Sequence, residues 1–131
     1  MDRIDVRFPG GKKVTAQLGP FTVATDQSVS DGGDGTAPGP FELFLASLAT
    51  CAGFYVLAFC DARGISTEGV SLCQRVELDP TSKLAKRIQI ELTLPPSFPQ
   101  KYREAVIRAA EGCKVKRTIA AGLEVVIVAA H

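Results

Sequence analysis

The sequence has a single histidine, and none of its cysteines are paired as CxxC. The histidine is His131, the last of 131 residues, which argues against a histidine-based catalytic triad and against a metal site built from several histidines. The four cysteines, Cys51, Cys60, Cys73 and Cys113, lack the spacing of zinc ribbons and of thioredoxin-like motifs. They are therefore either inert core thiols or redox groups. We predict neither a metal nor a cofactor.

Net charge is also nearly absent. Fifteen Lys and Arg residues face fourteen Asp and Glu residues, which leaves a formal charge of +1. A dedicated nucleic-acid-binding protein needs a clustered basic excess, so we predict no nucleic-acid partner. The composition is 46% apolar and 22% charged, as in globular proteins, and the length predicts one domain over residues 1–131. The first residues do not resemble a signal peptide, and we expect a cytoplasmic protein.

The pattern of apolar residues predicts an α+β fold. Alternation over the first 25 residues predicts a three-stranded antiparallel meander, and an Asp- and Gly-rich loop follows over 26–39. A second hairpin is predicted over 70–94, and an amphipathic helix follows Pro99. A short second helix is predicted over 114–121. The chain then ends in a strand at 123–129, which is nearly continuous in Val and Ile and is expected in the interior.

The longest apolar run predicts a central helix. Residues 43–60 contain no charge, Pro40 suits a first helical position, and Glu42 lies where a carboxylate favours the helix dipole. The run is near the minimum length for a membrane span, but it contains Ser, Thr and Gly, and the amphipathic strands need something to pack on. We therefore predict a long buried helix and no membrane. One short chain cannot cover an all-apolar helix, so a homodimer is expected.

Each cysteine can be a packed small residue or a functional thiol. Cys51 lies in the middle of the apolar helix, and Cys60 lies about 180° further round it, so one chain cannot join them in one site. Cys73 is expected on the polar face of a strand. Cys113 follows Gly112 at a helix start, where nearby cations favour a thiolate, and local physics makes it the best nucleophile in the chain. The cations are Lys114, Lys116 and Arg117.

Two motifs and the order of elements resemble the OsmC/Ohr family. The motifs are GPFEL at 39–43, which leads into a small-residue helix reaching Cys51, and CKV at 113–115. The likeness covers nearly the whole chain and is closest to the short OsmC-like branch. It implies an intertwined homodimer with two active sites at the interface. It further implies that Cys51 attacks a hydrogen or organic peroxide, that Cys113 resolves the sulfenic acid as a disulfide, and that an external dithiol reduces it.

The sequence departs from the family's peroxidases in two ways. Those enzymes place an Arg in the N-terminal strands, whereas this chain has no Arg between Arg7 and Arg63. They also carry a Glu ten residues before the reactive Cys, a position held here by Phe41. Glu42 stands nine residues before Cys51 and is either a catalytic group or a helix cap.

A thiol in an apolar mid-helix position needs a nearby cation to ionise at neutral pH. The candidates are Arg7, Lys12, Lys13 and Arg117, and we favour a residue of the meander. Lys is a weaker substitute for Arg, so we expect a slow peroxidase, or none, with Cys51 less acidic than in the Arg-bearing enzymes. The alternative is a non-catalytic or weakly catalytic OsmC-like protein, in which the interface pocket binds a small molecule or senses redox state.

Overall fold

The computed structural model describes residues 3–130, so His131 lies outside the described part. The contacts of the chain group into two compact units, which divide between Ala46 and Ser47. Each unit is described by itself.

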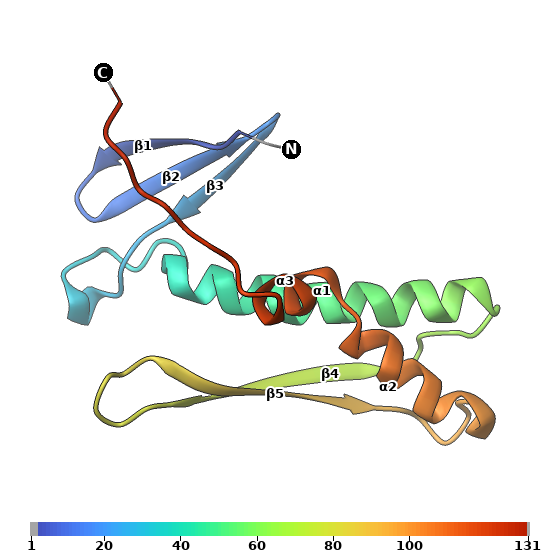
Figure 1. The fold of residues 1–131 in the computed structure, drawn as a ribbon. Coiled ribbons are helices and arrows are strands. Elements are labelled where there is room, and N and C mark those ends of the chain that lie inside the picture. Colours follow the sequence, from blue (N-terminus) through green and yellow to red (C-terminus); the bar gives the residue numbers. More distant parts are fainter. Residues whose placement is uncertain (1–2, 131) are drawn as a thin grey trace. The chain divides into compact units, whose positions relative to one another are not determined.

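The N-terminal unit contains the predicted meander. Strands β1 (Asp5–Gly10), β2 (Lys13–Leu18) and β3 (Phe21–Thr25) form an antiparallel sheet in the order β1-β2-β3 (Figure 1). Gly19 has a φ of 55° in the β2–β3 turn, which glycine adopts at no steric cost. The meander prediction is confirmed.

The loop before the central helix is ordered around one carboxylate. Asp26 is fully buried, and its Oδ1 accepts a hydrogen bond from the backbone N–H of Gln27 at 2.7 Å. Its backbone N–H donates to the carbonyl of Pro38 at 3.2 Å, which closes the loop. A short 3₁₀ helix, Val29–Asp31, lies within it.

Helix α1 runs from Pro40 to Ala62. The single chain covers only one side of the helix, as expected for a chain too short to surround it, and burial of the other side in a homodimer stays a prediction. Five residues are buried: Leu48, Ala52, Val56, Phe59 and Cys60. By length and composition alone the helix could cross a membrane, but the core helix of a soluble protein passes the same test.

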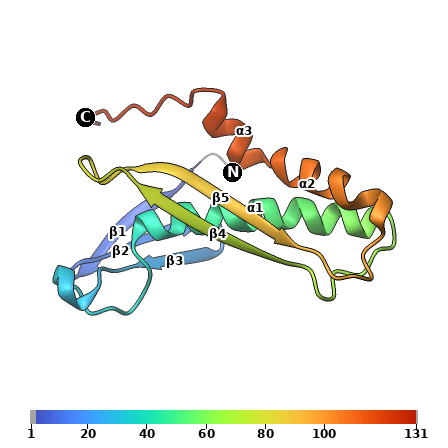
Figure 2. The same ribbon diagram turned by 90° about the horizontal axis from the view of Figure 1, so that it is seen from below.

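The second hairpin is confirmed. Strands β4 (Ser71–Leu78) and β5 (Ala85–Thr93) pair antiparallel, with Leu72 opposite Leu92 and Val76 opposite Ile88. Figure 1 shows the hairpin beside α1, and Figure 2 shows its strands crossing the helix obliquely. The alternation of the strands places one apolar face in the core and leaves Cys73 on the other face.

Two short helices complete the core of this unit. A 3₁₀ turn (Gln100–Tyr102) leads into α2 (Arg103–Glu111), and α3 spans Lys114–Ala120. Val106 and Ala110 of α2 are buried in one apolar cluster with the inner residues of α1. The helices predicted after Pro99 and from residue 114 are therefore confirmed.

The predicted C-terminal strand is wrong for the single chain. Residues 123–130 form neither helix nor strand, and their apolar side chains are exposed, with Ile127 at 93%. A strand needs the backbone groups of a neighbour, and no strand of the described chain pairs with this segment.

Candidate functional site

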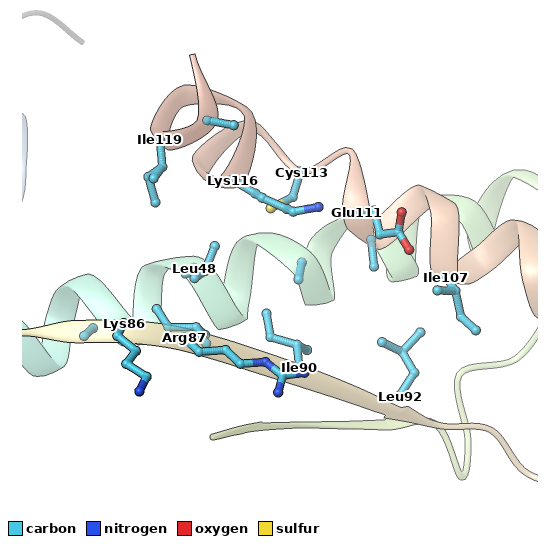
Figure 3. Close-up of a pocket in the computed structure, with 15 residues that line it drawn as sticks. Leu48, Lys86, Arg87, Ile90, Leu92, Ile107, Glu111, Cys113, Lys116 and Ile119 are labelled. Carbon is cyan, nitrogen blue, oxygen red and sulfur yellow. The ribbon is translucent and has the colours of Figure 1, made fainter. Parts of the chain in front are cut away.

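Cys113 lies at the connection between α2 and α3. Gly112 ends α2, and Cys113 is the N-cap residue of α3 with extended backbone angles. The side chain is only 1% exposed and points from this connection toward α1 (Figure 3). The thiol predicted to be the best nucleophile is therefore buried, which restricts direct access for a large substrate.

Cys51 approaches the same core from α1. It is partly buried, and it packs against the apolar cluster that contains Cys113. The next residue along the helix, Ala52, is buried in the cluster itself, so Cys51 stands at the border between the core and the surface. The fold thus brings two thiols that are distant in sequence to one apolar cluster, with Cys51 the more accessible of the two.

The other two cysteines have different surroundings. Cys60 is fully buried, and this burial raises the pKa of its thiol, with a further contribution from Asp61 and a partial offset from Arg63. A thiol held protonated in an apolar core is a poor nucleophile. Cys73 is exposed on β4 opposite Glu91 of β5. The position of Cys60 agrees with the packed role considered for it, whereas Cys73 is not packed and lies on the polar face of its strand, as predicted.

A hydrogen bond joins the helices that carry Cys51 and Cys113. Arg117 of α3 donates from Nη2 to the hydroxyl of Tyr55 on α1 at 3.3 Å, and from Nε to the carbonyl of Gly112 at 2.7 Å. Arg117 was among the cations considered from the sequence, whereas Tyr55 was missed. Its spacing of four residues from Cys51 was the available signal, because residues i and i+4 share a helix face.

A pocket of about 520 Å³ opens beside Cys113. Aliphatic residues of α1, β5, α2 and α3 form most of its wall, including Leu48, Ile90 and Ile107 (Figure 3). Charged side chains also line it: Lys86, Arg87, Glu111 and Lys116. The cavity suits a small, mainly apolar molecule with a polar group.

The other predicted site residues belong to the N-terminal unit. Glu42 accepts a hydrogen bond from the backbone N–H of Gly39 at 3.0 Å, so it caps the start of α1. Lys13, one of the favoured cations, forms an ion pair with Asp34 at 2.5 Å, and this bond raises the pKa of Lys13. Within residues 3–130 no group of three His, Cys, Asp or Glu side chains is placed to hold a metal.

Comparisons with known proteins agree on the fold. The family profile described as OsmC-like protein matches residues 33–128. The chain is similar to the structure of a protein from Psychrobacter arcticus 273-4 named as an osmotic stress induced and detoxification response protein (TM-score 0.75, 20% identity, 90% of this chain and 88% of that one).

Two further structures extend this likeness. One is an OsmC-like protein from Mycoplasma pneumoniae (TM-score 0.71, 15% identity, 93% and 91% covered). The other is an organic hydroperoxide resistance protein OsmC from Legionella pneumophila (TM-score 0.57, 24% identity, 89% and 87% covered). None of the curated proteins matches this sequence.

Proposed function

The chain belongs to the OsmC-like protein family, and we propose that it is a thiol-dependent hydroperoxide reductase that uses Cys51 and Cys113. The observation that carries this proposal is that Cys113 belongs to an apolar cluster against which Cys51 packs from α1. A structural neighbour from Legionella is named for organic hydroperoxide resistance, which supports the same chemistry.

The difference in burial assigns the two roles. Cys51 is partly exposed on α1, and we assign the attack on peroxide to it; Cys113 is 1% exposed, and we assign the resolving role to it. The Cys51 thiolate attacks one peroxide oxygen; the S–O bond forms as the O–O bond breaks, and the second oxygen leaves with the electron pair and takes up a proton. The thiol of Cys113 then displaces water from the sulfenic acid and forms a disulfide, which an external dithiol reduces.

The working unit in this proposal is a homodimer. In the single chain the outer face of α1 exposes Phe54 and Leu57, and the segment 123–130 exposes Val125, Ile127 and Val128. A second copy can cover both surfaces, and its backbone can supply the hydrogen bonds that the C-terminal segment lacks. We assign α1 to such a protein interface and not to a lipid bilayer, because its inner residues belong to the core with β4, β5 and α2.

A second candidate function follows from the pocket. Its aliphatic wall and charged side chains suit a small amphipathic molecule, and Cys113 borders it. In that case the thiols would bind or sense a ligand without turnover. Both candidates need reduced cysteines, and the cytoplasm keeps thiols reduced, so we place the protein there.

Peroxide consumption separates these two functions. The purified protein is mixed with hydrogen peroxide or cumene hydroperoxide and excess dithiothreitol, and the loss of peroxide is followed. We expect turnover by the wild type, none by C51S, and slower turnover by C113S, because in that variant dithiothreitol must attack the Cys51 sulfenic acid directly. C73S is the matched control, since Cys73 is exposed on β4, and it should behave as the wild type. If the wild type consumes no more peroxide than C51S does, the reductase proposal is wrong.

A further inference from the structure

The pocket beside Cys113 belongs to the C-terminal unit. All of its lining residues lie between Leu48 and Ala120, within the unit that begins at Ser47. Its volume of about 520 Å³ is in the range of cavities that hold small organic ligands. Among the described residues, Cys113 lines this pocket and Cys51 does not. A molecule in the pocket therefore contacts the buried thiol and not the more accessible one.

The wall of the pocket is aliphatic. Strand β5 contributes Ile90 and Leu92, α2 contributes Ile107, and α3 contributes Ile119 (Figure 3). The described part of the chain adds no Phe, Tyr or Trp to the lining. Such a wall offers an aromatic ring no stacking partner, whereas an alkyl chain is stabilised by burial against any aliphatic surface. The wall therefore favours a ligand with an aliphatic chain.

The charges around the pocket are mostly positive. Lys86, Arg87 and Lys116 line it together with a single carboxylate, that of Glu111. Lys86 already has a partner, because it forms an ion pair with Glu77 at 3.5 Å. Within residues 3–130 the side chains of Arg87 and Lys116 make no ion pair and no hydrogen bond. These two unpaired cations outweigh the one carboxylate, so the pocket favours an anionic headgroup over a cationic one.

The two unpaired cations come from different elements. Arg87 belongs to β5, and Lys116 belongs to α3, the helix that Cys113 caps (Figure 3). Arginine offers a carboxylate two parallel hydrogen bonds, and lysine offers a compact point charge. Both residues are exposed, so a carboxylate bound to them keeps part of its hydration and avoids most of the cost of burying a charge.

We propose that this pocket is a binding site for a medium-chain aliphatic carboxylic acid. The chain lies against Ile90 and Ile107, and the carboxylate lies toward Arg87 and Lys116. The inference goes beyond the proposed function, because binding involves neither a peroxide nor a reaction of a thiol. Its consequence for the reductase rests on the roles assigned above: a bound chain covers Cys113, the thiol that resolves the sulfenic acid.

The first test is calorimetric titration of the reduced, full-length protein. The probes are octanoate, butanoate, octanol and octyltrimethylammonium, each below its micelle concentration. Octanoate should bind at least tenfold more tightly than butanoate, because each additional buried methylene strengthens binding by up to about fourfold. Octanol measures the contribution of the chain alone and should bind more weakly than octanoate, and the cationic probe should bind most weakly of the eight-carbon compounds.

Substitutions of the two cations test the headgroup. K116Q and R87Q each remove one positive charge from the pocket, and K114Q and R75Q are their matched controls. Lys114 is exposed on the same helix and Arg75 is exposed on the same hairpin, and neither lines the pocket. We expect K116Q and R87Q each to weaken octanoate binding about threefold, as for an exposed charge pair, and to leave octanol binding unchanged. The two control variants should bind octanoate as the wild type does.

The methyl signals of isoleucine locate the bound acid. In nuclear magnetic resonance spectra of the isoleucine-labelled protein, octanoate should move the signals of Ile90, Ile107 and Ile119, which line the pocket. The signals of Ile4 and Ile65 should stay in place, because neither residue belongs to the lining. This measurement does not depend on the reactivity of any cysteine.

The site is overturned if octanoate does not bind, or if it binds no more tightly than octanol. Equal weakening by K116Q and K114Q, or methyl shifts confined to Ile4 and Ile65, would also overturn it, because the acid would then lie elsewhere. These measurements use no peroxide, so they are separable from the proposed function. A protein that binds octanoate but consumes no peroxide disproves only the reductase, and a reductase that binds no octanoate disproves only this site.

Discussion

Asp26 and Thr36 are joined by two hydrogen bonds to one carboxylate oxygen. Oδ2 of Asp26 accepts from the hydroxyl of Thr36 at 2.7 Å and from its backbone N–H at 3.1 Å. These bonds, with the N–H of Gln27 on the other oxygen, lower the pKa of Asp26 to about 2. A buried, ionised carboxylate therefore organises the loop that leads into α1.

This carboxylate predicts a pH-dependent stability. Asp26 binds a proton less readily in the folded state than in the unfolded chain, where its pKa has the ordinary value of 3.8. The stabilisation of the fold by ionised Asp26 is therefore complete above pH 4 and is lost as the pH falls toward 2. D26N replaces an acceptor oxygen with an amide donor facing N–H groups, and it should lower the urea midpoint at pH 7. The difference in urea midpoint between D26N and the wild type should narrow between pH 4 and pH 3. A gap that stays constant over this range would contradict the assignment.

Gly33 is predicted to tolerate no side chain. A Cβ at this position would lie 2.8 Å from Oδ1 of Asp26 and still closer to the backbone oxygen of Gln27, which cannot rotate away. G33A should therefore destabilise the protein by about 1–3 kcal/mol, as overpacking commonly does. G39A is the matched control in the same loop, because its Cβ would meet ordinary contacts of 3.4 Å or more. Equal urea midpoints for the two variants would show that the loop adapts.

Glu42 is predicted to stabilise the start of α1. Its carboxylate accepts from the N–H of Gly39, one of the donors that a helix terminus leaves free. E42A should lower the free energy of unfolding by about 1 kcal/mol, the usual value of such a cap, whereas E42Q retains an acceptor and should lose less. Urea unfolding at pH 7 compares the two. The cap role fails if E42A is as stable as E42Q.

Oxidation should join Cys51 to Cys113. Both thiols border one cluster, while burial keeps Cys60 protonated and Cys73 lies exposed on the hairpin. We expect their Cα atoms to lie within about 7 Å in the oxidised protein, as a disulfide requires. Peptide mapping after mild peroxide treatment should recover this pair. A main crosslink through Cys60 or Cys73 would refute the pairing.

The exposed face of α1 predicts self-association. Phe54 is 62% exposed in the single chain, more than its large apolar ring favours in water. If a second copy covers this face, F54D should place an unpaired charge in the interface and shift the protein toward monomer at micromolar concentration. S66D puts the same charge on an exposed polar loop residue and serves as the control. The dimer would be refuted if sedimentation found the wild type to be monomeric, or if F54D had the same association state as the wild type.

Local pattern was enough to predict most of the elements. The alternation in the meander and in the hairpin specifies which side chains share a face, because it repeats with the period of a strand. The long uncharged run after Pro40 specifies a helix. Gly112 likewise marked the break between α2 and α3. The function of Glu42 as a cap was also among the predicted alternatives.

The site depended on contacts that no local pattern contains. The sequence by itself determined most of the strands and helices, since these follow from neighbouring residues. Only the tertiary structure decided that Cys51 and Cys113 border one cluster, that Cys113 is the buried one, and that Arg117 reaches Tyr55. The segment 123–130 shows why local sequence is not sufficient. Its composition is that of a strand, but a strand forms only where another backbone pairs with it.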